Sequence, residues 1–203
     1  MFFRNQKIQL DAVKVLIGLN ILAFVLVEIS PDGGEWVDRF LGLSERGVAK
    51  GMIWQFVTYQ FVHAGVMHLL VNMIGIWFAG SIIERIMGYR RFVVFYLLCG
   101  IAGGVLQLVL SPGPVVVGAS GAVCGLVAGF STMFPRMEIT ALIFFVIPVK
   151  MQAKWLGIGI AVVSFLLWIT DLFPNVGNAA HLGGAIAGFL LVKWNRRQPL
   201  RVV

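Results

Sequence analysis

Gly118-Ala119-Ser120-Gly121 is the stretch of sequence on which the interpretation of this chain depends. It follows a Pro/Gly-rich break at residues 111–114 and opens an apolar run that continues to Phe134. Glycine permits tight turns and close approach of another backbone, and free N–H groups at a helix N-terminus can hold a developing negative charge. Ser120 is therefore a candidate nucleophile. Small residues around a serine are also common in packed membrane helices, and the tetrapeptide alone favours that structural interpretation.

The composition indicates an integral membrane protein. Of the 203 residues, 59% are hydrophobic and 12% are charged, and the mean hydropathy is +0.92, whereas a soluble domain is about a quarter charged. The length predicts a single membrane domain over residues 1–203. The net charge of +7 comes from basic residues at the ends of apolar runs, which favours a role in topology over nucleic-acid binding. Cys99 and Cys124 lie within apolar runs without metal-ligand spacing and are interpreted as packing residues. Neither a metal nor a cofactor is expected.

Apolar runs of about 17–25 residues can cross a bilayer as helices, and six stretches of this chain are candidates. The predicted fold is therefore an all-α bundle of six transmembrane helices. The stretches run from about Ala12 to Ile29, Val66 to Ile83, Phe92 to Leu110, Ala119 to Phe134, Ala153 to Ile169, and Asn178 to Trp194.

A seventh apolar stretch, Ile139 to Ile147, is too short to span and ends at Pro148; the sequence predicts an interfacial or re-entrant segment there. Charge supports six spans rather than seven. With six, thirteen of the sixteen Lys and Arg residues fall on one side of the membrane. The positive-inside rule then predicts that both termini are cytoplasmic, in what we expect to be a prokaryotic cell membrane.

The outer connection, residues 30–65, is long and rich in large aromatic side chains such as Trp36 and Trp54. Amphipathic aromatics favour the membrane–water interface. We expect a structured insertion that lies along the membrane and is partly helical around Trp36 to Leu41.

Polar side chains cluster at the predicted outer ends of three spans. His68 and Asn72 are four residues apart and share a helix face, while Ser120 and His181 begin two other spans. One interpretation is interhelical hydrogen bonding, worth about 0.6 kcal/mol per bond. The other is a catalytic dyad with Ser120 as nucleophile and His181 as base. His68, Asn72 and the backbone at Gly118 and Ser120 would then stabilise an oxyanion.

Glycines every four residues support proximity of the two dyad residues. Gly121, Gly125 and Gly129 repeat along one span, and Gly184 and Gly188 along another. Such faces allow two helix backbones to approach closely. We therefore expect the spans that carry Ser120 and His181 to pack together.

Three motifs in this order resemble the rhomboid intramembrane serine proteases: residues 63–72 with His63, His68 and Asn72, residues 118–121, and Ala180-His181-Leu182-Gly183-Gly184. The resemblance implies the six-helix fold, the Ser120–His181 dyad and an oxyanion site that includes His68 and Asn72. It also implies a structural role near the site for His63, and we expect Gly121, Cys124 and Gly184 to lie near the site as structural residues. Glu84-Arg85 is interpreted as a structural ion pair or cap.

Two positions depart from the pattern of the family. Trp54 is followed by Gln55 where an arginine is common, and Cys124 stands one turn after Ser120 where an aromatic residue usually packs on the histidine. Neither departure removes a reacting group, although the second removes support from His181.

The leading functional hypothesis is an intramembrane serine endopeptidase that cleaves transmembrane protein substrates through an acyl-enzyme, within membrane lipid and without nucleic acid. The alternative is a catalytically inactive relative that binds membrane proteins for quality control. A small transporter or channel is a third possibility, but it predicts deeper charges and internal repeats, which the sequence lacks.

Overall fold

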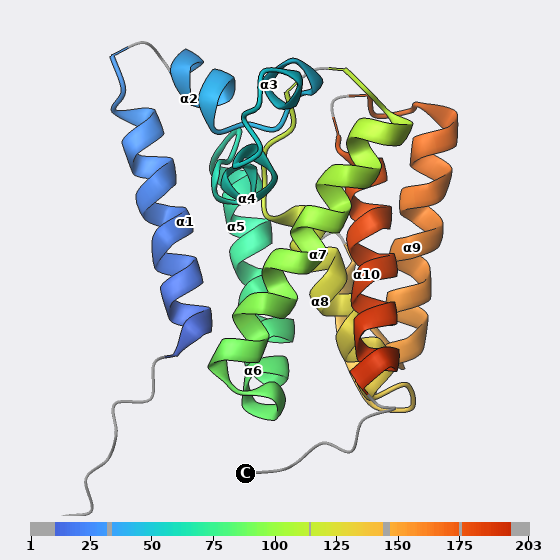
Figure 1. The fold of residues 1–203 in the computed structure, drawn as a ribbon. Coiled ribbons are helices and arrows are strands. Elements are labelled where there is room, and N and C mark those ends of the chain that lie inside the picture. The colour runs from blue at the N-terminus through green and yellow to red at the C-terminus, as the bar shows by residue number, and fades with distance from the viewer. Residues whose placement is uncertain (1–10, 32–33, 114, 144–146, 175, 196–203) are drawn as a thin grey trace, which may run out of the picture.

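The computed structural model describes residues 11–31, 34–113, 115–143, 147–174 and 176–195. The described chain is predominantly helical (Figure 1). Its elements are α1 (Ala12–Glu28), α2 (Glu35–Phe40), α3 (Glu45–Ala49), α4 (Gln55–Thr58), η1 (Tyr59–Phe61), α5 (Val66–Gly75), η2 (Ile76–Gly80), α6 (Ser81–Met87), α7 (Tyr89–Leu110), α8 (Ser120–Met133), β1 (Glu138–Ile143), β2 (Ile147–Gln152), α9 (Ala153–Thr170) and α10 (Asn178–Asn195).

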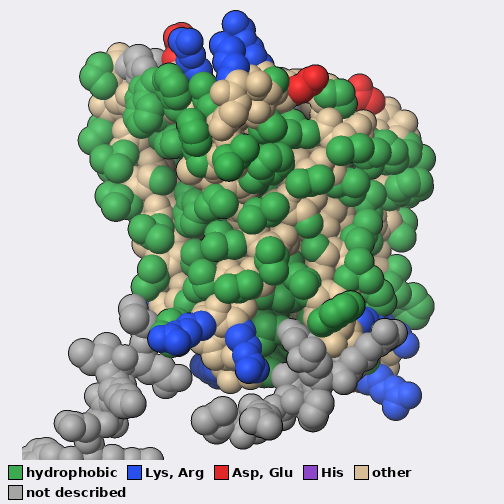
Figure 2. Space-filling view, viewed as in Figure 1, with side chains coloured by type: hydrophobic (Ala, Val, Ile, Leu, Met, Phe, Trp, Pro, Cys, Tyr) green, Lys and Arg blue, Asp and Glu red, His purple; other side chains and the backbone are tan. Residues whose placement is uncertain are grey.

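Three helices in the described part of the chain are long and apolar enough to cross a membrane: Val66–Met87, Tyr89–Leu110 and Ala153–Thr170. The first is continuous through the π-helical turn η2, and the shorter apolar helix α8 accompanies them. In Figure 2 a hydrophobic belt separates charged side chains at the two ends of the molecule. The chain is therefore an integral membrane protein, while the count of six spans stays a prediction.

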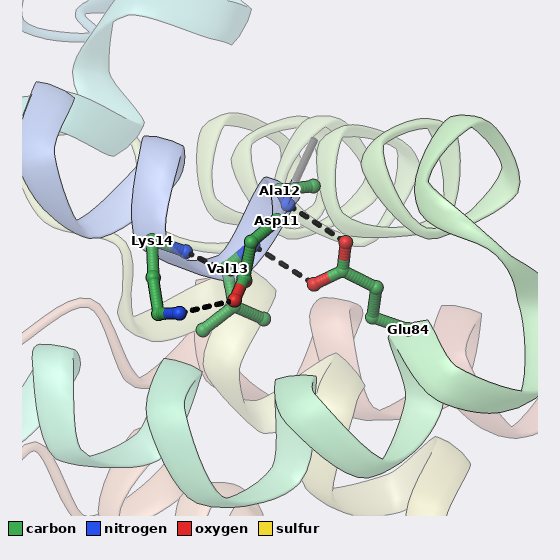
Figure 3. Close-up of polar contacts among 5 residues, drawn as sticks. All are labelled: Asp11, Ala12, Val13, Lys14 and Glu84. Atoms are coloured by element: carbon green, nitrogen blue, oxygen red, sulfur yellow. Dashed lines mark hydrogen bonds and ion pairs between the residues drawn. The ribbon is translucent and has the colours of Figure 1, made fainter. Parts of the chain in front are cut away.

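The start of α1 and the end of α10 lie at the same end of the bundle (Figure 1). Helix α1 is tied to α6 by the Glu84 carboxylate, which accepts the backbone N–H groups of Ala12 (2.7 Å) and Val13 (3.0 Å) (Figure 3). A carboxylate at a helix N-terminus satisfies unpaired donors and is attracted by the positive end of the helix dipole. The interpretation of Glu84 as a cap is thus confirmed.

The outer connection is structured, as predicted, and its helix α2 (Glu35–Phe40) matches the expectation around Trp36 to Leu41. Gln55, which belongs to the same connection, is fully buried. Its Nε2 donates to the carbonyl of Arg39 (3.0 Å), and its Oε1 accepts the N–H of Ser44 (3.2 Å). Gln55 therefore ties the connection together at the position where the family pattern led us to expect an arginine.

The short apolar stretch after α8 forms an antiparallel hairpin, with β1 paired to β2 so that Thr140 lies opposite Lys150. It lies at the end of the bundle opposite α2 and α3 (Figure 1). The prediction that this stretch is too short for a further helical span is confirmed, and its conformation is extended. Pro148 accounts for part of this, because its missing N–H and fixed ring disfavour a helix.

Helices α8 and α10 pack through their glycines. A Cβ on Gly184 would collide with the carbonyl oxygen of Gly121, and one on Gly188 with that of Gly125. Gly129 instead faces α7, where a Cβ would lie 2.7 Å from Phe95 Cζ. The predicted close contact of the two helices is confirmed, because only a hydrogen in place of a side chain fits between the backbones.

Candidate active site

Ser120 and His181 meet near the N-termini of α8 and α10. Ser120 is the first residue of α8, and His181 lies in the first turn of α10, which begins at Asn178. Ser120 Oγ lies 2.8 Å from His181 Nε2, within hydrogen-bond distance. The sequence separation of 61 residues is bridged by the glycine contact between the two helices.

Gly118 makes the turn into α8 and leaves room for His68. Its φ of +124° lies in a region that favours glycine, and a Cβ there would lie 2.5 Å from His68 Cε1 and 2.6 Å from His68 Nε2. The Gly118 N–H, predicted as part of the oxyanion site, donates to the carbonyl of Tyr59 (2.9 Å). This N–H is thus already paired, and the position serves the site through conformation and space.

His68 and Asn72 lie on α5, across from the start of α8. Asn72 Nδ2 donates to the carbonyl of His68 (2.8 Å), one turn earlier in the same helix. The amide carries two hydrogens, so one remains for another acceptor. Asn72 is buried and His68 half-buried, and both side chains line the same cavity as Ser120.

His63 braces this arrangement from the end of the outer connection. Its Nε2 accepts the N–H of Ala119 (3.5 Å), and its ring meets the ring of His68 edge-on at a centroid distance of 5.1 Å. Burial, followed by repulsion from the neighbouring His68, lowers the pKa of His63 to about 4. The ring is therefore neutral at pH 7 and can accept the Ala119 hydrogen.

A cavity of about 970 Å³ opens beside Ser120 and His181. Its polar side chains include His68 and Asn72, and apolar side chains from α9 and from the segment before α8 complete its walls. Figure 1 shows this segment descending into the bundle before α8 begins. Ser120 and His181 thus border a cavity with both polar and apolar walls.

The remaining predicted site residues lie on the same two helices. Gly121 and Gly184 form the α8–α10 contact, and Cys124 is a half-buried free thiol one turn after Ser120. Within the described ranges, no group of three or more His, Cys, Asp or Glu side chains is arranged to hold a metal ion.

The Rhomboid domain family model matches residues 50–197, which include every side chain of this site. The chain belongs to the rhomboid family. It is 33% identical over 180 residues to rhomboid protease GluP of Bacillus subtilis, covering 86% of this chain and 33% of GluP. It is 36% identical over 154 residues to RHOMBOID-like protein 4 of Arabidopsis thaliana, covering 74% of this chain and 36% of that protein. The chain thus spans about a third of the length of these relatives.

Two groups in this rhomboid site were missed by the sequence interpretation. Gln107 of α7 accepts the N–H of Ala180 through Oε1 (3.0 Å) and donates to the carbonyl of Ser111 (3.2 Å), which joins α7 to the residue before His181. Trp168 Nε1 donates to Ser111 Oγ (3.1 Å) across the cavity rim. A glutamine inside an apolar span was the available signal for the first group, because polar side chains in spans are costly.

Proposed function

We propose that this rhomboid is an intramembrane serine endopeptidase, with Ser120 as nucleophile and His181 as general base. The observation that carries the proposal is the 2.8 Å separation of Ser120 Oγ and His181 Nε2 beside the cavity. A relative of the chain is named a rhomboid protease. The substrates are transmembrane proteins, whose helices unwind locally to expose a peptide carbonyl that a regular helix keeps hydrogen-bonded.

The chemistry follows from the two groups. Ser120 Oγ attacks the peptide carbonyl carbon while its proton passes to His181 Nε2, which gives a tetrahedral oxyanion and an imidazolium. When the C–N bond breaks, the imidazolium returns the proton to the leaving amine, and an acyl-enzyme remains. Water then attacks the ester carbonyl, gives a proton to His181, and the acid product leaves as Ser120 regains its proton.

The oxyanion is stabilised by donors on the side of the cavity opposite His181. His68, the free amide hydrogen of Asn72 and the backbone N–H of Ser120 fill this role. Ser120 begins α8, and the first N–H groups of a helix have no partner within that helix. Gly118 contributes by leaving space for His68, since a side chain there would meet that imidazole.

The proposed topology has six spans: α1, the continuous helix from α5 to α6, α7, α8, α9 and α10. It forms a single domain with both termini in the cytoplasm and the cavity open to the outer side. The common end of the bundle at which α1 starts and α10 ends supports an even number of crossings.

The decisive experiment is cleavage of a model transmembrane substrate by purified, reconstituted protein, with labelling by a fluorophosphonate probe in parallel. Ser120→Ala should lower cleavage to the assay floor, at least about 1000-fold, and abolish labelling. His181→Ala should lie at the same floor, and the double variant no lower, because the two groups act as a unit.

Ser131→Ala is the matched control, because Ser131 lies on the same helix with a buried hydroxyl that has no hydrogen-bond partner among the described residues. It should retain parental cleavage and labelling. Cleavage by Ser120→Ala at a tenth of the parental rate would end the proposal and favour a non-catalytic binding protein.

A further inference from the structure

Tyr59 belongs to the outer connection and lies where α7 and the first residues of α8 and α10 meet. It is 1% exposed, and it lines the cavity together with Ser120 and His181. Its backbone carbonyl accepts the N–H of Gly118, two residues before Ser120. The backbone of Tyr59 therefore fixes the entry into α8.

The side chain of Tyr59 connects the same point to α7. Its hydroxyl donates to the carbonyl of Gly100 (2.7 Å), and its ring fits against glycines of that helix. A Cβ on Gly104 would lie 3.3 Å from Tyr59 Cε1, and one on Gly103 would lie 3.5 Å from Tyr59 Oη. The ring therefore packs closely against α7 at Gly104, and the hydroxyl lies within van der Waals range of Gly103.

The hydroxyl also lies near the residues that are adjacent to Ser120 and His181 in the sequence. A Cβ on Gly121, the residue after Ser120, would lie 3.4 Å from Tyr59 Oη and 3.2 Å from the carbonyl oxygen of Ala180. Ala180 immediately precedes His181, and its carbonyl also approaches Gly103. One small region therefore holds the Tyr59 hydroxyl, the first turn of α8 and the residue before the base.

We propose that Tyr59 is a positioning residue that sets the distance between Ser120 and His181 by bridging α7, the first turn of α8 and the start of α10. This inference rests on the proposed protease function. Position 124, one turn after Ser120, holds a cysteine, so α8 supplies no ring at that level. The bracing ring comes from the outer connection instead.

Tyr59→Phe tests the hydroxyl with little cost to the fold. Gly100 lies inside α7, so its carbonyl keeps an intrahelical partner when the hydroxyl is removed. We expect kcat to fall about tenfold, because displacements near 1 Å at a catalytic centre cost on the order of 100-fold. KM should stay within about twofold of the parent, and fluorophosphonate labelling of Ser120 should slow in parallel with kcat.

Tyr59→Leu removes the ring and should lower kcat by about 100-fold, so that phenylalanine restores part of the activity that leucine loses. The matched control is Tyr96→Phe, since Tyr96 is also fully buried in α7 but its hydroxyl interacts with Asn20 of α1. Tyr96→Phe should keep the parental kcat and labelling rate.

Thermal unfolding of the same samples separates positioning from stability. A fall in kcat for Tyr59→Phe at unchanged folded fraction supports the inference. Three results overturn it. The first is a kcat and labelling rate of Tyr59→Phe within twofold of the parent, the second is a loss of kcat in Tyr59→Phe equal to its loss of folded protein, and the third is a loss of kcat in Tyr96→Phe as large as that in Tyr59→Phe. If Ser120→Ala is inactive while Tyr59→Phe matches the parent, only this inference fails; if Ser120→Ala still cleaves, the proposed function fails and the inference with it.

Discussion

The two sides of the site are built from different kinds of contact. Between α8 and α10, backbone meets backbone, because the carbonyls of Gly121 and Gly125 fill the places that side chains at Gly184 and Gly188 would take. Between α5 and α8, a backbone meets a side chain: the space beside Gly75 is filled by Val123 Cγ1. A carbonyl inside a helix cannot move without the helix, whereas a valine can be shortened or displaced.

This difference matches the roles proposed for the two sides. The α8–α10 contact holds the Ser120–His181 pair, for which a displacement near 1 Å lowers the rate on the order of 100-fold. The α5 side holds His68 and Asn72, which lie against the turn at Gly118. We infer that the nucleophile and base are set by a rigid contact and the oxyanion donors by an adjustable one.

The largest effect is expected from Gly184→Val, which places three carbon atoms where the Gly121 carbonyl lies. The helices must separate by more than 1 Å, so cleavage should fall at least about 1000-fold. Overpacking should also lower the free energy of unfolding by about 1–3 kcal/mol. Cleavage of a reconstituted substrate and equilibrium unfolding measure the two effects.

Gly159→Val is the matched control, because Gly159 lies within α9 and a Cβ there would meet no atom within 4 Å. It should leave both activity and stability close to the parent. Full activity of Gly184→Val would show that the α8–α10 contact does not set the dyad.

Removal of an oxyanion donor should have a smaller and graded effect. His68→Ala and Asn72→Ala should each lower kcat about 100-fold, the lower end of what loss of one such donor costs. Substrate binding should persist, because neither side chain belongs to the α8–α10 contact. The measurement is kcat and KM for each variant, and unchanged kcat in the double variant would leave both residues with a structural role only.

Helix positions followed from the sequence to within a few residues, because apolar runs and their breaks determine where a chain can cross a bilayer. The second span, predicted to end at Ile83, continues to Met87, because charged residues at the end of an apolar run do not by themselves end a helix; it ends at Gly88, whose φ is +77°. The hairpin after α8 was missed because a short apolar run does not distinguish strand from interfacial segment.

The parts of the site that depend on the spacing of residues along one helix were predictable from the sequence. The parts that depend on packing between distant segments were not. His68 and Asn72 share a helix face by their separation of four residues, and the glycine repeats indicated the α8–α10 contact. Tyr59 was passed over as one aromatic among several in the outer connection. Nothing local in the sequence indicates that its ring enters a glycine-lined space on α7, since that contact joins segments about 40 residues apart.

The smallest effect, and the sharpest test of the comparison, comes from Gly75. A Cβ added there would collide with Val123 Cγ1. Gly75→Ala should therefore lower kcat only a few-fold, because a side chain yields more easily than a backbone and alanine improves helix propensity by about 1 kcal/mol. Val123→Ala, which removes the obstructing methyl groups, should restore activity in the double variant.

A double-mutant cycle on unfolding free energies should give a coupling of about 0.5–3 kcal/mol in favour of the Gly75→Ala/Val123→Ala pair, as expected for residues in contact. Gly184→Ala provides the contrast, since its obstacle is the carbonyl of Gly121 and no side-chain substitution removes a carbonyl. Its activity should stay low when Val123→Ala is added. Two outcomes would contradict the comparison: rescue of Gly184→Ala by Val123→Ala, and failure of Val123→Ala to rescue Gly75→Ala. In either case rescue would not depend on whether the obstacle is a side chain, so the α5 and α10 sides of α8 would not differ in the way proposed.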